Sequence, residues 1–241
     1  MSLWDVADYV RLRTGGDDDQ LDEFAQRHAV RGKRVLELGC GPGRAAAALA
    51  RRHGALVTAL DASSSMLSAA HEHVPAEVEL VEGRAEALPF DGERFDAILA
   101  NFVVHLLDRP QAFSEARRVL VPGGVLVVKT RDPATVHDWW ASPLFPSVES
   151  IERGRFPTGR QLVDELREAG FEGETIELID VDREFSRAEA LVKLRSGAYS
   201  TLRLIPAAEL EDGIRRAPHA LDDPIRYTLT LLRVEARRPG R

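Results

Sequence analysis

The sequence predicts an α/β protein built on a doubly wound, mostly parallel sheet of seven strands. Short apolar runs alternate with segments that favour helices, which is the pattern of a sheet covered by helices on both faces. The first apolar run leads into "GCGPG", in which glycine recurs at every second position. An acidic residue ends the second run, at the place where strands of such sheets meet their ligands.

The chain first alternates strand and helix twice. Residues 33–38 ("KRVLEL") are expected to form a buried strand, and the alanine-rich residues 43–54 a helix that ends at a glycine. A second strand is expected over residues 55–61 because apolar and β-branched residues dominate there. The helix predicted over residues 63–74 can be capped by Ser63 or Ser64.

The next three strands are predicted over residues 76–83, 94–102 and 125–130. Between the last two, residues 109–121 are expected to form a helix, with Asp108 as its cap. The sequence Pro-Gly-Gly at 122–124 is expected to turn the chain into the fifth strand.

After Thr130 the sequence is rich in aromatic residues and proline and has no clean period. A helix over 158–170, a strand over 172–182, helices over 187–195 and 207–217, and a last strand over 224–238 are expected. Ser186 and Glu189 form a capping-box pattern at the start of the helix over 187–195. These elements divide the chain into an N-terminal helical extension (1–30), a main domain (31–185 and 223–241) and an inserted helical lobe (186–222).

Composition narrows the kinds of function. The 241 residues carry a net charge of −7, which disfavours broad binding to nucleic acid through Lys and Arg. Apolar runs are short and interrupted by charge, so no membrane-spanning segment is expected, and the first residues lack the order of a signal peptide. Cys40 is the lone cysteine, so no disulfide framework is expected. We therefore expect a cytoplasmic protein that binds neither nucleic acid nor membranes.

The glycine turn after the first strand suits two kinds of bound molecule, because glycine adopts positive φ and lets a ligand approach the backbone. The dinucleotide fingerprint has its third glycine three residues after the second, where this chain has Arg44. The pattern here is Gly-x-Gly-x-Gly, at Gly39, Gly41 and Gly43. Asp61 ends the second strand, where a carboxylate can accept the ribose hydroxyls of NAD or of S-adenosylmethionine. These residues alone leave both ligands open.

Four motifs that follow one another along the chain are more specific than the glycine turn alone: "VLELGCGPGR", "ALDASSSML", "GRAEALPFDGERFDAILANFVVHLL" and "ARRVLVPGGVLVV". Together, over residues 30–130, they resemble the class I S-adenosylmethionine-dependent methyltransferases, particularly the branch with the ubiquinone/menaquinone-biosynthesis and trans-aconitate methyltransferases. The resemblance implies a Rossmann-like fold, S-adenosyl-L-methionine as methyl donor, S-adenosyl-L-homocysteine as product, a small-molecule acceptor and no metal. A macromolecular acceptor, or donor binding without transfer, stays open as an alternative.

The resemblance also implies a donor site. The glycine turn lets the backbone pack against the donor, Glu37 orients its methionine end, and Asp61 holds its ribose. Two pairs of residues contact the adenine, and Asn101 lies beside the methionine part. The full implied set is Glu37, Gly39, Gly41, Gly43, Asp61, Ala62, Met66, Ala85, Glu86 and Asn101.

For the acceptor, the resemblance points to the region where the chain departs from the common motifs. His105 follows the fourth strand and is expected either to accept a proton or to line the pocket or cap a helix. Trp139 and Trp140 are adjacent, so on a helix they would point in different directions, with one entering the substrate cavity while the other packs. Arg195, Tyr199 and Arg203 are spaced by four and could share one helical face, turned either inward toward the substrate or outward. The lobe at 186–222 is expected to cover the substrate pocket.

Overall fold

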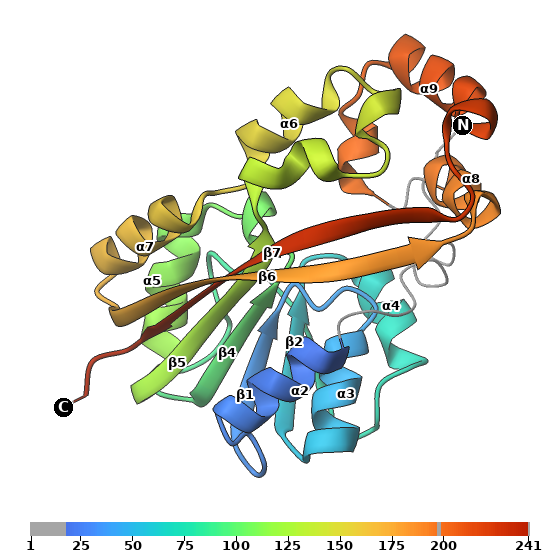
Figure 1. The fold of residues 1–241 in the computed structure, drawn as a ribbon. Coiled ribbons are helices and arrows are strands. Elements are labelled where there is room, and N and C mark those ends of the chain that lie inside the picture. Colours follow the sequence, from blue (N-terminus) through green and yellow to red (C-terminus); the bar gives the residue numbers. More distant parts are fainter. Residues whose placement is uncertain (1–17, 197–198, 241) are drawn as a thin grey trace. The chain divides into compact units, whose positions relative to one another are not determined.

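A computed structural model describes residues 18–196 and 199–240 (Figure 1). Seven strands form one sheet in the order β3-β2-β1-β4-β5-β7-β6, which confirms the predicted strand number. The strands are β1 (Arg34–Leu38), β2 (Leu56–Asp61), β3 (Glu79–Glu82), β4 (Phe95–Asn101), β5 (Leu120–Arg131), β6 (Glu172–Phe185) and β7 (Ile225–Arg237). The helices and 3-10 turns are α2 (Asp18–Arg27), α3 (Arg44–His53), α4 (Ser64–His71), η1 (Val104–Leu106), α5 (Arg109–Val119), η2 (Pro133–Asp138), η3 (Ser142–Leu144), α6 (Val148–Arg155), α7 (Gly159–Glu168), α8 (Arg187–Arg195), η4 (Ser200–Arg203) and α9 (Ala207–Ala220).

The first five strands are parallel, and their register brings three chain segments to one edge of the sheet. Leu38 at the end of β1 pairs with Leu60 of β2 and with Ala100 of β4. The residues that directly follow these three positions therefore emerge together, at the carboxyl ends of the strands. Ligands of open α/β sheets bind at this edge.

The last strand makes the sheet mixed. Side chains of β7 bond to those of β6 in reverse order: Thr230 to Asp180 and Thr228 to Asp182. This order shows that β7 runs antiparallel to β6. The sheet is therefore mostly parallel, as the sequence predicts.

By its internal contacts the chain divides into two compact units. The larger unit holds the described residues 18–130, 159–177 and 233–240, and the smaller unit holds 131–158, 178–196 and 199–232. The strands β5, β6 and β7 each pass from one unit to the other. The lobe expected at 186–222 lies within the smaller unit. The extension expected at 1–30 is described only from residue 18, where α2 begins.

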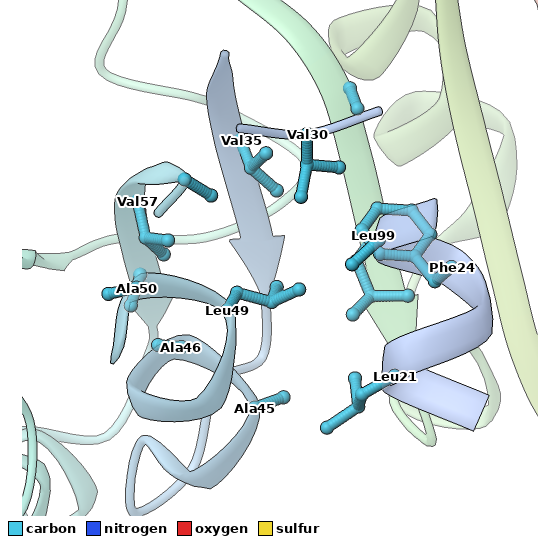
Figure 2. Packing of buried hydrophobic residues seen from close by; sticks show 14 of the residues in the cluster. Leu21, Phe24, Val30, Val35, Ala45, Ala46, Leu49, Ala50, Val57 and Leu99 are labelled. Atoms are coloured by element: carbon cyan, nitrogen blue, oxygen red, sulfur yellow. The ribbon is translucent and has the colours of Figure 1, made fainter. Parts of the chain in front are cut away.

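The core of the larger unit lies where α2 and α3 meet strands β1, β2 and β4. Figure 2 shows Leu21 and Phe24 of α2 beside Leu49 of α3 and Leu99 of β4. Alanines on α3 let this helix approach the sheet closely, which explains why the predicted helix is so rich in alanine. Helices α5 and α7 contact each other on the other side of this part of the sheet (Figure 1).

The smaller unit has a hydrophobic core of its own. Trp139 and Trp140 pack there with Phe145, and α8 and α9 contribute Leu194 and Ala217. Three elements that the sequence did not predict, η2, η3 and α6, supply much of this core. No helix in the described part of the chain is long and apolar enough to cross a membrane.

Helix caps are where sequence reasoning was most accurate. Ser63 accepts a hydrogen bond from the Met66 amide, and Asp108 accepts one from the Gln111 amide. Ser186 accepts one from the Glu189 amide at the start of α8, whose bounds are those predicted. Each side chain satisfies an amide that has no acceptor within its own helix.

The Pro-Gly-Gly segment is not a turn before the fifth strand, contrary to prediction. β5 begins at Leu120, so the segment lies inside it. The Gly123 amide donates to the Arg238 carbonyl at 3.0 Å, and the Arg238 amide donates to the Gly124 carbonyl at 2.9 Å. Backbone pairing with a segment more than a hundred residues away thus overrides the local turn signal.

Two expectations about helical faces were wrong. Trp139 has an extended backbone after η2, so the tryptophan pair does not lie on a helix. α8 ends at Arg195, and Tyr199 is extended (φ −107°, ψ 122°) at the start of the separate turn η4. The spacing of four therefore puts no shared face through Arg195, Tyr199 and Arg203, because helical periodicity does not continue across the break.

Candidate functional site

Two of the three glycines in the turn after β1 are required by the protein's own packing. A Cβ placed on Gly39 would lie 2.8 Å from Cβ of Val103, and one on Gly43 would lie 2.5 Å from Cγ1 of Val74. Both glycines also have positive φ, +65° and +78°. Any side chain at either position would meet another part of the larger unit, whether or not a ligand is bound.

Gly41 is the glycine that leaves room for a ligand. Its φ is +53°, and a Cβ placed on it would meet no atom within 4 Å. The Gly41 amide donates to Oδ2 of Asp61 at 2.8 Å. The turn after β1 is thereby tied to the end of β2, with the open side of Gly41 left accessible.

Asp61 has hydrogen-bonding capacity beyond the turn that it holds. Its Oδ1 accepts the Ser63 amide at 2.9 Å, and the side chain is half-buried. Each carboxylate oxygen has two acceptor sites, so two backbone bonds leave both oxygens able to accept hydroxyl donors. The two backbone bonds also fix the orientation of the carboxylate, which suits it for binding a diol.

Glu37 is the most perturbed acid of this site. Burial raises the pKa of Glu37 to about 8, against the opposing hydrogen bond from the Ala46 amide; Asp61 raises it further and Lys129 lowers it. The Ala46 amide is in the first turn of α3, where amides lack intrahelical acceptors, and the capping position is Gly43, which has no side chain. Glu37 therefore caps α3 from the strand. Its Oε2 is buried and has no hydrogen-bond partner among residues 18–196 and 199–240.

The four residues expected around an adenine have different surroundings. Ala62 is exposed, Met66 is half-buried on α4, and Ala85 is buried. Glu86 is tied into the fold, because its Oε1 accepts the Asp108 amide at 3.1 Å and so holds the start of α5. The Glu86 side chain thus has a structural partner, and the backbone of residues 85–86 is left to recognise a base.

Asn101, His105 and Lys129 lie at the ends of β4 and β5. Asn101 pairs in register with Lys129, and its Oδ1 is buried with no hydrogen-bond partner in the described parts of the chain. Lys129 is 3% exposed, and its Nζ lies 5.9 Å from the ring centroid of Phe102. His105 is half-buried on η1. The larger unit therefore places a buried acid, a buried lysine and a buried amide oxygen beside the glycine turn.

Comparison with known proteins shows which protein family this region resembles. Residues 36–128 match the protein family described as "Methyltransferase domain". This part of the chain is similar to methyltransferase domains. The matched residues include β2, β4 and the last three residues of β1, and with them the ten donor-site residues expected from the sequence; Lys129 lies one residue beyond the match. The match confirms the resemblance seen in the four motifs.

Two relatives are similar to this chain over less than half of its length. A fatty-acid O-methyltransferase of Mycolicibacterium smegmatis is 41% identical over 46% of this chain and 42% of its own length. A demethylmenaquinone methyltransferase of Chlorobaculum tepidum is 39% identical over 41% of each. The chain thus spans less than half the length of these relatives. The crystal structure of YcgJ from Bacillus subtilis has a TM-score of 0.65 at 20% identity, covering 92% of this chain and 99% of that one, which shows a common fold.

The residues present in the methyltransferase domain fit S-adenosylmethionine. The unpartnered oxygen of Glu37 suits the ammonium group of the donor's methionine part. The oriented carboxylate of Asp61 suits the two ribose hydroxyls, and the open side of Gly41 gives the backbone contact that a side chain would prevent. Among the described residues no group of three or more His, Cys, Asp or Glu is arranged to hold a metal ion. Burial raises the pKa of the Cys40 thiol, which disfavours the nucleophilic thiolate.

The acceptor residues expected from the sequence lie in the smaller unit, apart from His105. Trp139 and Trp140 are buried with ring centroids 5.7 Å apart, and Tyr199 lies 5.2 Å from Trp139. Arg195 and Arg203 are exposed. The structure therefore brings the three aromatic residues together and leaves both arginines on the surface.

Sequence reasoning missed Lys129 and Arg131. Both are buried, at the end of the apolar run of β5. A usable signal was present: two basic residues at alternate positions close "VLVVKTR", where the strand pattern points both side chains to one face.

Proposed function

We propose that this chain transfers the methyl group of S-adenosylmethionine to a small organic acceptor. One observation carries the proposal: the Asp61 carboxylate, held by the amides of Gly41 and Ser63, stands at the end of β2 next to the open face of the glycine turn. Of the relatives compared, one is named for a fatty acid and one for demethylmenaquinone, which favours a small-molecule acceptor. We also propose that the protein is cytoplasmic, as expected from the sequence.

Methyl transfer from this donor requires the protein to align the acceptor more than to activate the methyl group. A bound sulfonium supplies an already activated methyl group. The acceptor atom forms its bond to the methyl carbon as the carbon–sulfur bond breaks, and the sulfur keeps the electron pair. Holding the two partners in line can supply much of the rate enhancement. Glu37 and Asp61 would fix the donor at its two ends, and a base such as His105 is needed only where the acceptor must lose a proton.

Calorimetric titration tests donor binding. S-adenosylhomocysteine and S-adenosylmethionine should each bind at one site per chain, and NADH should not bind. Binding of NADH without a response to either sulfur compound would overturn the proposal in favour of an oxidoreductase.

A second experiment tests transfer and the acceptor class. The protein is incubated with methyl-labelled donor and, separately, with a metabolite extract, bulk RNA and bulk protein. Label in small molecules supports the proposal, whereas label only in RNA or protein indicates a macromolecular methyltransferase. Donor binding with no transfer in any fraction contradicts the enzymatic part, because function belongs to the site rather than to the fold.

A further inference from the structure

Two buried hydrogen-bond donors of the smaller unit have no acceptor in the described part of the chain. Nε of Arg131 and Nε1 of Trp140 are buried, and neither has a hydrogen-bond partner among residues 18–196 and 199–240. The two residues are 8% and 7% exposed. A guanidinium and an indole can only donate, so each atom requires an acceptor. Buried polar groups in folded proteins nearly always have a partner, which makes the missing acceptor informative.

Both donors border the same aromatic residue. Cζ of Arg131 lies 5.7 Å from the ring centroid of Trp139, and the ring of Trp140 lies 5.7 Å from that of Trp139. Tyr199 contacts both indole rings, with centroids 5.2 and 6.1 Å away. The two donors thus belong to a single cluster of Arg131, Trp139, Trp140 and Tyr199, which we name the arginine–aromatic cluster.

The charges around this cluster do not cancel. Nη1 of Arg131 donates to Glu152 at 3.0 Å, and the other Glu152 oxygen accepts from the hydroxyl of Thr201. That hydroxyl in turn accepts from Arg155 at 2.9 Å. The residues of this network therefore carry two guanidinium groups and one carboxylate, with Arg131 paired to Glu152 directly and Arg155 linked to it through the Thr201 hydroxyl.

Tyr227, which lies near the cluster, adds no negative charge. Burial keeps the pKa of Tyr227 above its ordinary value, and Arg183 and Arg131 both act on this tyrosine as positive charges. Tyr227 is therefore neutral at ordinary pH. A water molecule could accept from the two donors, but it would add no negative charge to a network of two guanidinium groups and one carboxylate.

We propose that the arginine–aromatic cluster binds a carboxylate carried by the methyl acceptor, with Arg131 Nε and Trp140 Nε1 donating to its oxygens. The inference rests on the proposed function, because only a methyltransferase has a methyl acceptor. The residues that would bind the carboxylate belong to the smaller unit alone. Arg131 then determines specificity for acidic molecules, a role that the exposed Arg195 and Arg203 are poorly placed to fill. The aromatic rings provide an apolar surface for the remainder of the molecule.

Indole NMR reports on this site directly, because the chain has three tryptophans and Trp140→Phe identifies the Trp140 signal. Benzoate serves as the probe, and benzamide as its neutral analogue of the same shape. Benzoate should shift the Trp140 indole N–H signal saturably, and benzamide should shift it weakly or not at all. Equal shifts with both compounds, or none with benzoate, would overturn the proposal.

Variants then test the two donors separately. Trp140→Phe and Arg131→Gln should each weaken benzoate binding, measured by calorimetry, by roughly tenfold or more, since each removes a buried hydrogen bond to a charged group. Arg131→Lys, which keeps the charge beside Glu152, covers the case in which the glutamine variant does not fold. Arg153→Gln removes an exposed arginine of the same unit and should leave affinity unchanged. Unchanged affinity in the folded Trp140 and Arg131 variants contradicts the assignment.

Binding of S-adenosylhomocysteine, measured in the same preparations, separates this inference from the proposed function. Donor product that binds while benzoate does not would overturn the carboxylate site and leave the methyltransferase proposal standing. Benzoate that binds at the cluster while neither sulfur compound binds would uphold the anion site and overturn the proposed function.

Discussion

Gly39 and Val103 are packed so closely that a side chain at Gly39 would clash with Val103. A Cβ on Gly39 would lie 2.8 Å from Cβ of Val103 and closer still to one of its methyl groups. Val103 follows β4 and is itself buried. The contact therefore joins the turn after β1 to the segment after β4, and both segments border the proposed donor site.

Gly39→Ala should destabilise the fold by about 2–4 kcal/mol, from the left-handed backbone and the overpacking against Val103 together. Urea unfolding measures this change. Val103→Ala removes the methyl group that would lie nearest to the new side chain but keeps Cβ, 2.8 Å away, so the double variant should lose somewhat less stability than the two single losses added together. Strict additivity would show that packing against Val103 is not what requires glycine here.

Asp61→Asn should weaken binding of S-adenosylhomocysteine by about 1–3 kcal/mol, because a charged acceptor is lost. Calorimetry measures the change. Asp96→Asn is the matched control: this acid, near the start of β4, bonds to Arg34 at the start of β1 and thus lies at the opposite edge of the sheet. Equal effects of the two substitutions would remove Asp61 from the donor site.

Glu37 should make the protein less stable as pH rises. Its pKa in the folded protein is about 8, above the ordinary value of 4.5, so between these values the folded state holds a proton that the unfolded state has released. Its stabilisation is thus complete below pH 4.5 and is lost toward pH 8, at up to about 1.4 kcal/mol per pH unit. Glu37→Gln should flatten this slope in urea unfolding. Parallel pH curves for the two proteins would contradict the raised pKa.

The glycine turn shows what a sequence can and cannot reveal. Spacing alone predicted a close approach to the backbone, and Gly41 does face open space. At Gly39 and Gly43, however, the approaching groups are Val103 and Val74, which lie far along the chain. Such partners are visible only after the fold brings them together.

The same limit explains the errors in the smaller unit. Caps such as Ser186 were predictable because a cap depends on a few neighbouring residues. The helical face assumed through Arg195 and Tyr199 depended on a helix that ends before it reaches Tyr199. The basic residue that closes "VLVVKTR" was a signal for Arg131, but the contact of Arg131 with Trp139 forms only when the chain folds.

Glu23 should stabilise the protein at neutral pH and cease to do so in acid. Arg233, almost fully buried, donates two hydrogen bonds of 2.8 Å to the Glu23 carboxylate. These bonds hold the pKa of Glu23 at about 2, below the ordinary 4.5, so its stabilisation is present above pH 4.5 and is lost as pH falls toward 2. Because Glu23 is half-exposed, we expect Glu23→Gln to cost only about 1 kcal/mol at pH 7.

A thermal or urea unfolding series from pH 7 to pH 2 checks this prediction. The difference between Glu23→Gln and the parent protein should shrink as pH falls and vanish near pH 2. Glu149→Gln breaks an exposed pair with Arg153 on α6 and should change stability by less than about 0.5 kcal/mol. A loss at Glu149 as large as that at Glu23 would show that the burial of Arg233 adds nothing.

Gly213→Ala should impair methyl transfer and leave donor binding unchanged. Gly213 lies on α9, and a Cβ placed there would lie 2.7 Å from Cδ1 of Phe145 and 2.9 Å from the Leu144 carbonyl, so the core of the smaller unit must shift. The residues assigned to the donor all belong to the larger unit. If the helices between β6 and β7 cover the acceptor pocket, as expected from the sequence, the variant should bind S-adenosylhomocysteine normally and transfer methyl groups poorly. Gly154→Ala on α6 of the same unit meets no atom within 4 Å and should retain transfer. Full transfer by Gly213→Ala, with its unfolding transition shifted as the clash requires, would show that acceptor binding does not depend on this core.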